Sequence, residues 1–383
     1  MFDVLLSIVI AFTITFLAIP VIITVAETKK LFDVPDERKI HITPVTPLGG
    51  LGIFAGFIFA CLLTVHFETA FKFQYFIAAS LIIFFLGLKD DILVISPIKK
   101  FIGQVLAAFM VIYYGELQIK SMHGFLGLYQ MPEMFSLLLT YFAVIVIINS
   151  FNLIDGVDGL AGSLGLIALS IFGIYFFVVD MPAYSILAFS MAASLLAFLI
   201  FNFQPAKIFM GDTGSLLIGL VCAILVVKFI NVASSTDVSY PIIAAPAIGF
   251  TILLIPLLDT LRVFGIRIFY RRSPFSPDRN HIHHILLDKG FSHRAVTIIL
   301  VTANLFAITM VYLGRTMFSC TALIFFAFAF FFAIISLFYY MPSRVPKLVI
   351  AKANKKETNG ADLKSSKLVP FSKDASTILE QKN

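Results

Sequence analysis

Acidic and amide side chains gather at three places along an otherwise apolar chain. They are the pair Asp90-Asp91, the segment 149–159 and the segment 209–215. Each adjoins the end of an apolar stretch, and carboxylates at membrane ends are costly to desolvate, so several at one depth indicate a functional site. Mg²⁺ takes one or two protein oxygens and leaves its other positions to water and substrate phosphates. The three segments therefore predict a Mg²⁺ site for phosphate chemistry, with Mn²⁺ as a substitute.

The segment 149–159 carries its polar side chains at every third position: Asn149, Asn152, Asp155 and Asp158. On a continuous helix this spacing forms one slowly rotating stripe. Gly156 and Gly159 are positions at which that helix could end, and a glycine beside an acid allows the backbone to approach a ligand closely.

The segment 209–215 reads Phe-Met-Gly-Asp-Thr-Gly-Ser and opens an apolar stretch. A helix that begins here offers free backbone N–H groups to a phosphate. The hydroxyls of Thr213 and Ser215 can equally cap this helix or bind a ligand. Asp90 and Asp91, taken alone, could be helix-end charges paired with Lys89 or Lys99, and the two other segments are what favours a shared site.

A fourth segment, 273–284, lies in the long basic connection 262–294 and reads Ser-Pro-Phe-Ser-Pro-Asp-Arg-Asn-His-Ile-His-His. Arginine binds phosphate through two parallel hydrogen bonds, and histidine can donate to phosphate or sugar oxygens. His281 and His284 would share a helical face, which makes a metal site an alternative, but no Cys or Glu stands at ligand spacing. We predict anion recognition, with a solvated basic loop as the plain alternative.

The elements that must position these segments are membrane helices. Of 383 residues, 60% are hydrophobic and 13% are charged, a balance that excludes a soluble globular enzyme and a disordered chain. We predict an all-α fold, a polytopic membrane helix bundle of about eleven transmembrane helices. The apolar stretches are 2–26, 48–66, 74–88, 98–114, 134–151, 162–179, 183–203, 213–233, 241–261, 295–313 and 317–340.

The basic residues predict the orientation of this bundle. Connections on one side, together with the tail after residue 340, hold 24 of the 28 Lys and Arg residues. The positive-inside rule then places the N-terminus outside, and the C-terminus and all four polar segments in the cytoplasm. Residues 1–340 form the membrane domain, and residues 341–383 form a basic, mobile cytoplasmic tail. Because the charge lies in short connections and not on one compact face, we expect no nucleic-acid partner.

Together these segments resemble the polyprenyl-phosphate N-acetylhexosamine-1-phosphate transferases of glycosyltransferase family 4. These bacterial enzymes load the first sugar phosphate onto undecaprenyl phosphate. Ile282 interrupts the run of histidines that the muramyl-pentapeptide branch carries, so the resemblance favours the UDP-N-acetylglucosamine branch. The matching motifs appear in the family's order: Asp33 to His41, Pro47 to Gly50, Asp90-Asp91, Asn149 to Gly159, Met210 to Ser215 and Ser273 to His284.

The resemblance implies transfer of N-acetylglucosamine-1-phosphate, or a related N-acetylhexosamine-1-phosphate, from a UDP-sugar to undecaprenyl phosphate with release of UMP. This would be the first membrane step of a cell-surface polysaccharide pathway in the bacterial inner membrane, and a homodimer is one assembly that it allows. For Mg²⁺ it implies Asn152 and Asp212. The implied catalytic carboxylates are Asp90, Asp91, Asp155 and Asp158. The implied substrate-binding residues are Phe209, which would stack on uracil, with Asn149, Arg279, His281, His283, His284, Lys39 and His41.

Three alternatives remain open at the level of sequence. The nearest is a phospho-N-acetylmuramoyl-pentapeptide transferase. A secondary transporter would also carry acids and broken helices at membrane depth, although it would place them at the midplane and usually shows an internal repeat, of which we find none. A non-catalytic membrane scaffold would tolerate any change at Asp212.

Overall fold

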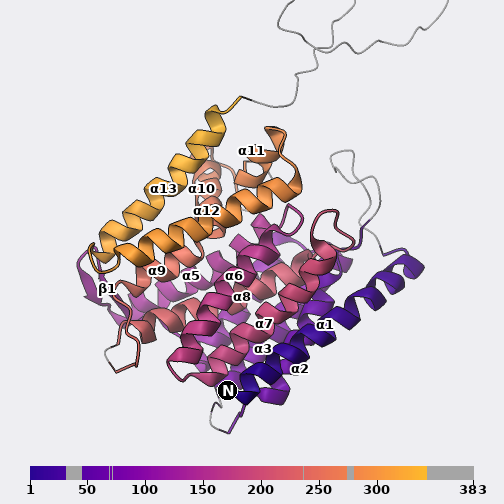
Figure 1. The fold of residues 1–383 in the computed structure, drawn as a ribbon, viewed down its shortest axis with the longest axis horizontal. Coiled ribbons are helices and arrows are strands. Elements are labelled where there is room, and N and C mark those ends of the chain that lie inside the picture. The colour runs from indigo at the N-terminus through magenta and orange to yellow at the C-terminus, as the bar shows by residue number, and fades with distance from the viewer. Residues whose placement is uncertain (32–44, 69, 71, 236, 274–279, 343–383) are drawn as a thin grey trace, which may run out of the picture.

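The computed structural model describes residues 1–31, 45–68, 70, 72–235, 237–273 and 280–342, and it is almost entirely helical (Figure 1). The first half contains α1 (Phe2–Lys29), α2 (Gly49–Thr64), α3 (Phe73–Ile92), α4 (Pro97–Phe109), a π-helical turn η1 (Met110–Tyr114), β1 (Ser121–Phe125), β2 (Leu128–Gln130) and α5 (Glu133–Ile154). The second half contains α6 (Leu160–Val178), α7 (Pro182–Asn202), α8 (Gly211–Ala233), α9 (Ala245–Ile252), α10 (Leu254–Phe269), α11 (Ile282–Asp288), α12 (His293–Gly314) and α13 (Cys320–Tyr340).

Seven of the described helices are long and apolar enough to cross a membrane: α1, α5, α6, α7, α8, α12 and α13. The bent pair α9 and α10 adds an eighth span if it is taken as one. The all-α membrane bundle is therefore confirmed, whereas the count of about eleven spans stays a prediction. The predicted stretch 48–66 forms only the 16-residue α2, and the stretch 98–114 forms the 13-residue α4 followed by η1.

The stretch 241–261 is broken, and its two helices meet at an angle of 80°. Pro256 lies four residues after Ile252, so its ring would clash with the Ile252 carbonyl in a continuous helix. Asn304 of α12 satisfies the backbone groups that the break leaves without helical partners. Its Oδ1 accepts from the Ile255 N–H at 3.3 Å, and its Nδ2 donates to the Ile252 carbonyl at 3.1 Å. Such side-chain substitution is what allows a broken helix inside a membrane bundle.

The helix α8 forms the centre of the bundle and is buried along most of its length. It packs against α3 and α5, and in Figure 1 the more peripheral helices α1 and α13 lie at opposite edges. Both edge helices expose long apolar side chains, as expected of surfaces that face lipid.

Glycines bring two neighbouring helices unusually close to the first turn of α8. A Cβ at Gly87 of α3 would lie 2.5 Å from the Thr213 Cα, and a Cβ at Gly50 of α2 would lie 2.4 Å from the Gly214 nitrogen. Only a residue without a side chain fits at either position. The charged end of α3 is thereby held directly against the start of α8.

Candidate active site

The start of α8 is capped by a carboxylate from another helix. Asp91, in the last turn of α3, accepts hydrogen bonds from the backbone N–H of Asp212 at 2.7 Å and of Thr213 at 3.0 Å. The Thr213 hydroxyl also donates to Asp91. An anion at this position compensates the unpaired N–H groups and the positive end of the helix dipole. Two of the N–H groups that the start of this helix offers to a phosphate are thus already bonded to Asp91, whose catalytic role stays a prediction.

Four side chains from four different helices meet beside this cap, and we call them the polar cluster: Asp90, Lys100, Asn152 and Asp212. The ammonium of Lys100 lies at their centre, 3.1 Å from Asp90 Oδ2 and 3.3 Å from Asn152 Oδ1, and it also contacts Asp212 Oδ2. Asn152 Nδ2 donates to Asp212 Oδ1 at 2.8 Å. The three oxygens therefore converge on one position that already holds a positive charge.

All four members of the polar cluster lie near helix ends. Asp90 is in the last turn of α3, Lys100 in the first turn of α4, Asn152 in the last turn of α5 and Asp212 in the first turn of α8. The site is therefore at one face of the bundle and not at its middle. The three polar segments predicted to come together do so, since each contributes a member.

Sequence reasoning missed Lys100, because it stands next to Lys99 in a short basic connection. The signal was present in the spacing of α4 and α5. Lys100 and Gln104 are four residues apart, and Asn152 and Asn149 are three apart, so each pair lies on one helical face. The two faces meet in register: Lys100 contacts Asn152, and Gln104 contacts Asn149.

The side-chain amide of Asn149 is hydrogen-bonded within the helix bundle. Its Nδ2 donates to Gln104 Oε1 and to the Ile145 carbonyl, both at 2.8 Å, and its Oδ1 accepts from Gln104 Nε2 at 3.3 Å. The residue is buried. This pairing links α4 to α5, and a contact between Asn149 and substrate stays a prediction.

Asp155 follows Ile154, the last residue of α5. The helix therefore ends just before Gly156, which is one of the two glycines at which the sequence indicated that it could end. In the described part of the chain no hydrogen bond or ion pair reaches the Asp155 carboxylate. Burial, together with the neighbouring carboxylates of Asp212, Asp91 and Asp158, raises the pKa of Asp155 to about 8. A carboxyl group in this state is one that a bound cation would stabilise in its ionised form.

Asp158 is directed to a different part of the bundle. Its Oδ1 lies 3.1 Å from His293 Nδ1, its Oδ2 accepts from the Ala206 N–H at 3.3 Å, and its backbone carbonyl accepts from the Thr297 hydroxyl at 2.9 Å. The contacts with His293 and Thr297 hold the turn between α5 and α6 against α12, and the contact with Ala206 joins it to the connection between α7 and α8. A catalytic role for Asp158 stays a prediction.

The histidines at the start of α11 pack against the turn that contains Asp155. A Cβ at Gly156 would lie 2.4 Å from His283 Nε2, so glycine is required there. The ring centroids of His281 and His283 are 5.7 Å apart and the two rings are nearly parallel, and the ring centroids of His283 and His284 are 4.3 Å apart. Burial and the neighbouring His284 lower the pKa of His283 to about 3, so its ring is neutral at physiological pH.

Phe209 is fixed through its backbone, where its N–H donates to the Thr46 carbonyl and its carbonyl accepts from the Gly49 N–H, both at 2.9 Å. Its ring is partly exposed beside the entrance to α8. Stacking of this ring on uracil stays a prediction. Arg279, Lys39 and His41, the other predicted substrate contacts, lie outside the described residues.

The donor set of the polar cluster fits Mg²⁺. Across the described ranges no three acidic, histidine or cysteine side chains form a metal cage by themselves. Mg²⁺ does not need one, because it binds through one or two carboxylates and keeps waters and substrate phosphates as its other ligands. Asp212 and Asn152 supply hard oxygens, and the Lys100 ammonium marks the point between them where a cation is favoured.

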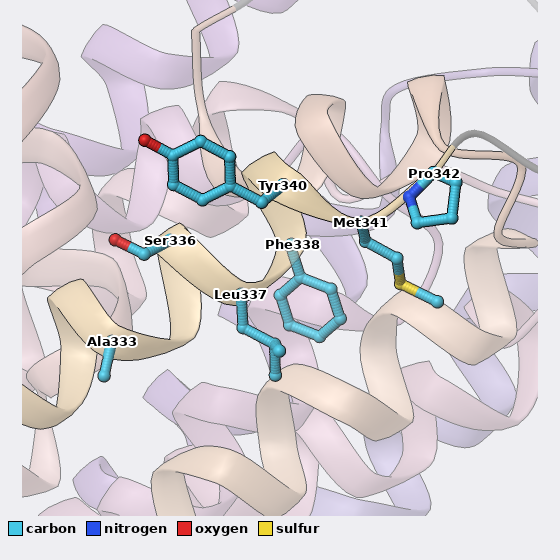
Figure 2. Close-up of a pocket in the computed structure, with 7 residues that line it drawn as sticks. All are labelled: Ala333, Ser336, Leu337, Phe338, Tyr340, Met341 and Pro342. Atoms are coloured by element: carbon cyan, nitrogen blue, oxygen red, sulfur yellow. The ribbon is translucent and has the colours of Figure 1, made fainter.

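An apolar pocket lies elsewhere, along the last turns of α13 (Figure 2). It is lined mainly by rings and aliphatic side chains, and no member of the polar cluster contributes to it. The residues that line it are Ala333, Ser336, Leu337, Phe338, Tyr340, Met341 and Pro342.

Comparison with known proteins indicates the family of this chain. The sequence profile of glycosyl transferase family 4 matches residues 73–230, a range that contains the whole polar cluster. The undecaprenyl-phosphate alpha-N-acetylglucosaminyl 1-phosphate transferase of Yersinia pestis is 30% identical over 278 residues, which cover 71% of this chain and 74% of the relative. The protein of the same name from Escherichia coli K12 is 30% identical over 284 residues, covering 73% and 75%. A decaprenyl-phosphate N-acetylglucosaminephosphotransferase of Mycobacterium tuberculosis H37Rv is 32% identical over 291 residues, covering 70% and 71%. The chain therefore belongs to glycosyl transferase family 4.

Proposed function

We propose that this protein transfers N-acetylglucosamine-1-phosphate from UDP-N-acetylglucosamine to undecaprenyl phosphate, giving UMP and a lipid diphosphate sugar. The observation that carries the proposal is the polar cluster, in which three oxygens and one ammonium from four helices converge at one face of an apolar bundle. Relatives named for N-acetylglucosamine support this sugar over the muramyl-pentapeptide alternative. The place of the cluster at helix ends favours a transferase over a transporter with a midplane site.

The reaction needs no covalent help from the protein. The acceptor phosphate has a second pKa of about 6, by analogy with phosphoserine, and is mostly a dianion at neutral pH. One of its oxygens attacks the phosphorus that carries the sugar, and the bond from that phosphorus to the bridging oxygen of UMP breaks. Catalysis then rests on positioning and on neutralisation of phosphate charge.

The residues of the polar cluster have different roles in this reaction. Lys100 contacts the carboxylates in the free protein and is placed to neutralise phosphate oxygens when substrate arrives. Asp90, whose Oδ1 is held by the Ile95 N–H at 2.9 Å, is placed to take any proton that remains on the acceptor phosphate. Asn152 and Asp212 would hold Mg²⁺, with Asp155 nearby. When bound, this ion supplies further charge neutralisation of the diphosphate.

We also propose that the face with the polar cluster is cytoplasmic and that the protein lies in the bacterial inner membrane. The basic residues support this orientation, and Lys72 precedes the first residue of α3, at the opposite end of that helix from Asp90.

A tag placed after Asn383 should accordingly be degraded by added protease only after the cytoplasmic side is opened, because the positive-inside rule retains basic segments there. Protease protection of tagged protein in intact cells and in inverted vesicles measures this. Cleavage in intact cells would place the polar cluster on the outer face.

For the donor site we expect Phe209→Ala to raise the KM for UDP-N-acetylglucosamine by about 10-fold, as loss of one base-stacking contact does, and to change kcat little. Stacking on uracil is made equally in the ground and transition states, so its loss weakens binding uniformly. Steady-state kinetics in detergent give both constants. Phe203→Ala, an exposed ring on the same connection, is the matched control. An unchanged KM with a lowered Tm would make Phe209 a packing residue only.

The proposed substrates are tested by incubating the purified protein with polyprenyl phosphate and each of several UDP-sugars, followed by mass spectrometry of the lipid product. We expect N-acetylglucosamine to be transferred together with one phosphate.

A further inference from the structure

A further aspartate, which the sequence did not single out, is buried beside the histidine segment. Asp259 lies on α10, within an apolar stretch, and its residue is 0% exposed. A carboxylate removed from water in this way is costly unless it is paired and hydrogen-bonded. Asp259 is paired on three sides, and all three partners belong to the beginning of α11 or to α10 itself.

The contacts of Asp259 are directed at His281. Its Oδ2 lies 2.8 Å from His281 Nδ1, and its Oδ1 accepts from the Ile282 N–H at 3.0 Å and from Arg262 Nη2 at 2.9 Å. Arg262 Nη2 also donates to the Asn280 carbonyl. Asp259 therefore holds both the backbone at the start of α11 and the ring of the residue that precedes it.

The contact between Asp259 Oδ2 and His281 Nδ1 determines which nitrogen of His281 can bind another group. An ionised carboxylate is only an acceptor, so Nδ1 must carry the hydrogen and Nε2 is left free. His281 is 4% exposed, and within the described ranges its Nε2 is buried with no hydrogen-bond partner. A buried polar atom without a partner is destabilising, so the free Nε2 is suited to a hydrogen bond with a ligand.

The free nitrogen lies next to the site already described. The His281 ring stacks on that of His283, and His283 packs on Gly156, directly after Asp155. His283 is 1% exposed, and its Nδ1 is likewise buried without a partner in the described part of the chain. Two imidazoles with unused nitrogens thus adjoin the turn that carries Asp155.

We infer that Asp259 is a positioning residue, which holds His281 in one tautomer and orientation so that its unprotonated Nε2 accepts a hydrogen bond from a hydroxyl group of the donor sugar. The inference rests on the proposed function, since it requires that His281 contacts the donor. Asp259 lies on α10, far in sequence from the acidic segments. Its effect on transfer is exerted only through the ring of His281.

The first test measures the tautomer of His281 directly. NMR spectra of the full-length protein in detergent, labelled with ¹⁵N-histidine, should show His281 protonated at Nδ1, with its signals identified by their loss in His281→Gln. In Asp259→Asn the amide can donate to Nδ1, and we expect the hydrogen to move to Nε2. Arg262→Gln, which removes another partner of Asp259 and keeps the carboxylate, should leave the tautomer unchanged. A wild-type His281 protonated only at Nε2 would overturn the inference, whether or not the variants fold.

The second test is a double-mutant cycle on kcat. Asp259→Asn should lower kcat by about 10²-fold, as expected when the sugar phosphate is no longer held in the orientation for attack, with a smaller change in the KM for UDP-N-acetylglucosamine. In the His281→Gln background the same substitution should change kcat less than about 2-fold, because the ring through which it acts is gone.

Equal losses in both backgrounds would show that Asp259 is merely structural and would overturn the inference. Full turnover in His281→Gln would overturn the inference as well, because the reaction would then not need the ring that Asp259 positions. The proposed transfer reaction would not be contradicted by that result. Failure of the wild-type protein to release UMP would instead refute the proposed function, and the NMR result would still report whether Asp259 sets the tautomer.

Discussion

Asp212→Asn is expected to lower kcat about 10³-fold, within the range seen when one preorganised electrostatic group is removed from an active site. The carboxylate of Asp212 contacts both Lys100 and Asn152, so the substitution removes the negative charge at the point where the oxygens converge. The fold should survive, because Asp91 binds the backbone N–H of residue 212 and not its side chain. Steady-state kinetics and thermal unfolding of the same preparation measure the two effects.

Asp91→Asn is the informative comparison for this substitution. It weakens the cap of α8, and loss of a helix cap costs about 0.5–2 kcal/mol, so the Tm should fall. The two acids would thus separate into one that acts on turnover and one that acts on stability. A normal rate in Asp212→Asn, or a normal Tm with lost turnover in Asp91→Asn, would contradict this division.

Lys100→Met is expected to have the second-largest effect, a loss of about 10²-fold in kcat/KM. Methionine keeps much of the length of the side chain and removes the ammonium that lies among Asp90, Asn152 and Asp212. Phosphate charge is then less well neutralised in the transition state. Because the ammonium occupies the point where the oxygens converge, its removal should also leave the binding of Mn²⁺, titrated by electron paramagnetic resonance, equal or tighter.

Lys99→Met is the matched control, since Lys99 is the neighbouring residue and is exposed. It carries the same charge in the same connection and contributes nothing to the polar cluster, so its kinetics should match those of the wild type. Equal losses in the two variants would mean that general surface charge, and not the contacts of Lys100, is responsible. Much weaker Mn²⁺ binding in Lys100→Met would show that Lys100 supports the cation site instead of competing for it.

The polar segments were the most predictable part of the site. Carboxylates are rare in an apolar chain, so Asp90, Asn152 and Asp212 stood out although they are far apart in sequence, and the structure does place them together. The roles of their neighbours were not predictable. Asp91 is adjacent to Asp90, yet successive residues on a helix point about 100° apart, and so one caps α8 while the other contacts Lys100.

Lys100 and Asp259 were missed for opposite reasons. A lysine in a short connection between apolar stretches is what membrane orientation alone predicts, so residue type did not distinguish Lys100 from Lys99 and only its helical spacing to Gln104 did. Asp259 was a single charge within an apolar stretch, and its partner His281 is 22 residues away in sequence. Only the return of the chain at α11 brings the two together, and hydropathy cannot predict it.

The number of spans was less predictable than the type of fold. Hydropathy alone finds apolar segments, but it does not distinguish a straight helix from a broken one. The stretch 241–261 satisfies the composition of a span and is bent by 80° near Pro256, where Asn304 takes up the free backbone groups. The stretch 98–114 similarly divides into α4 and a π-helical turn.

The central claim is that the bond broken is the phosphoanhydride of the nucleotide sugar. The most direct measurement is the identity of the nucleotide released when purified protein, Mg²⁺, UDP-N-acetylglucosamine and polyprenyl phosphate are combined in detergent. Release of UMP, with reversal when UMP is added because one anhydride replaces another, is the expected result. Release of UDP would contradict the claim even if sugar had reached the lipid, because the polar cluster would then serve attack on carbon and not on phosphorus.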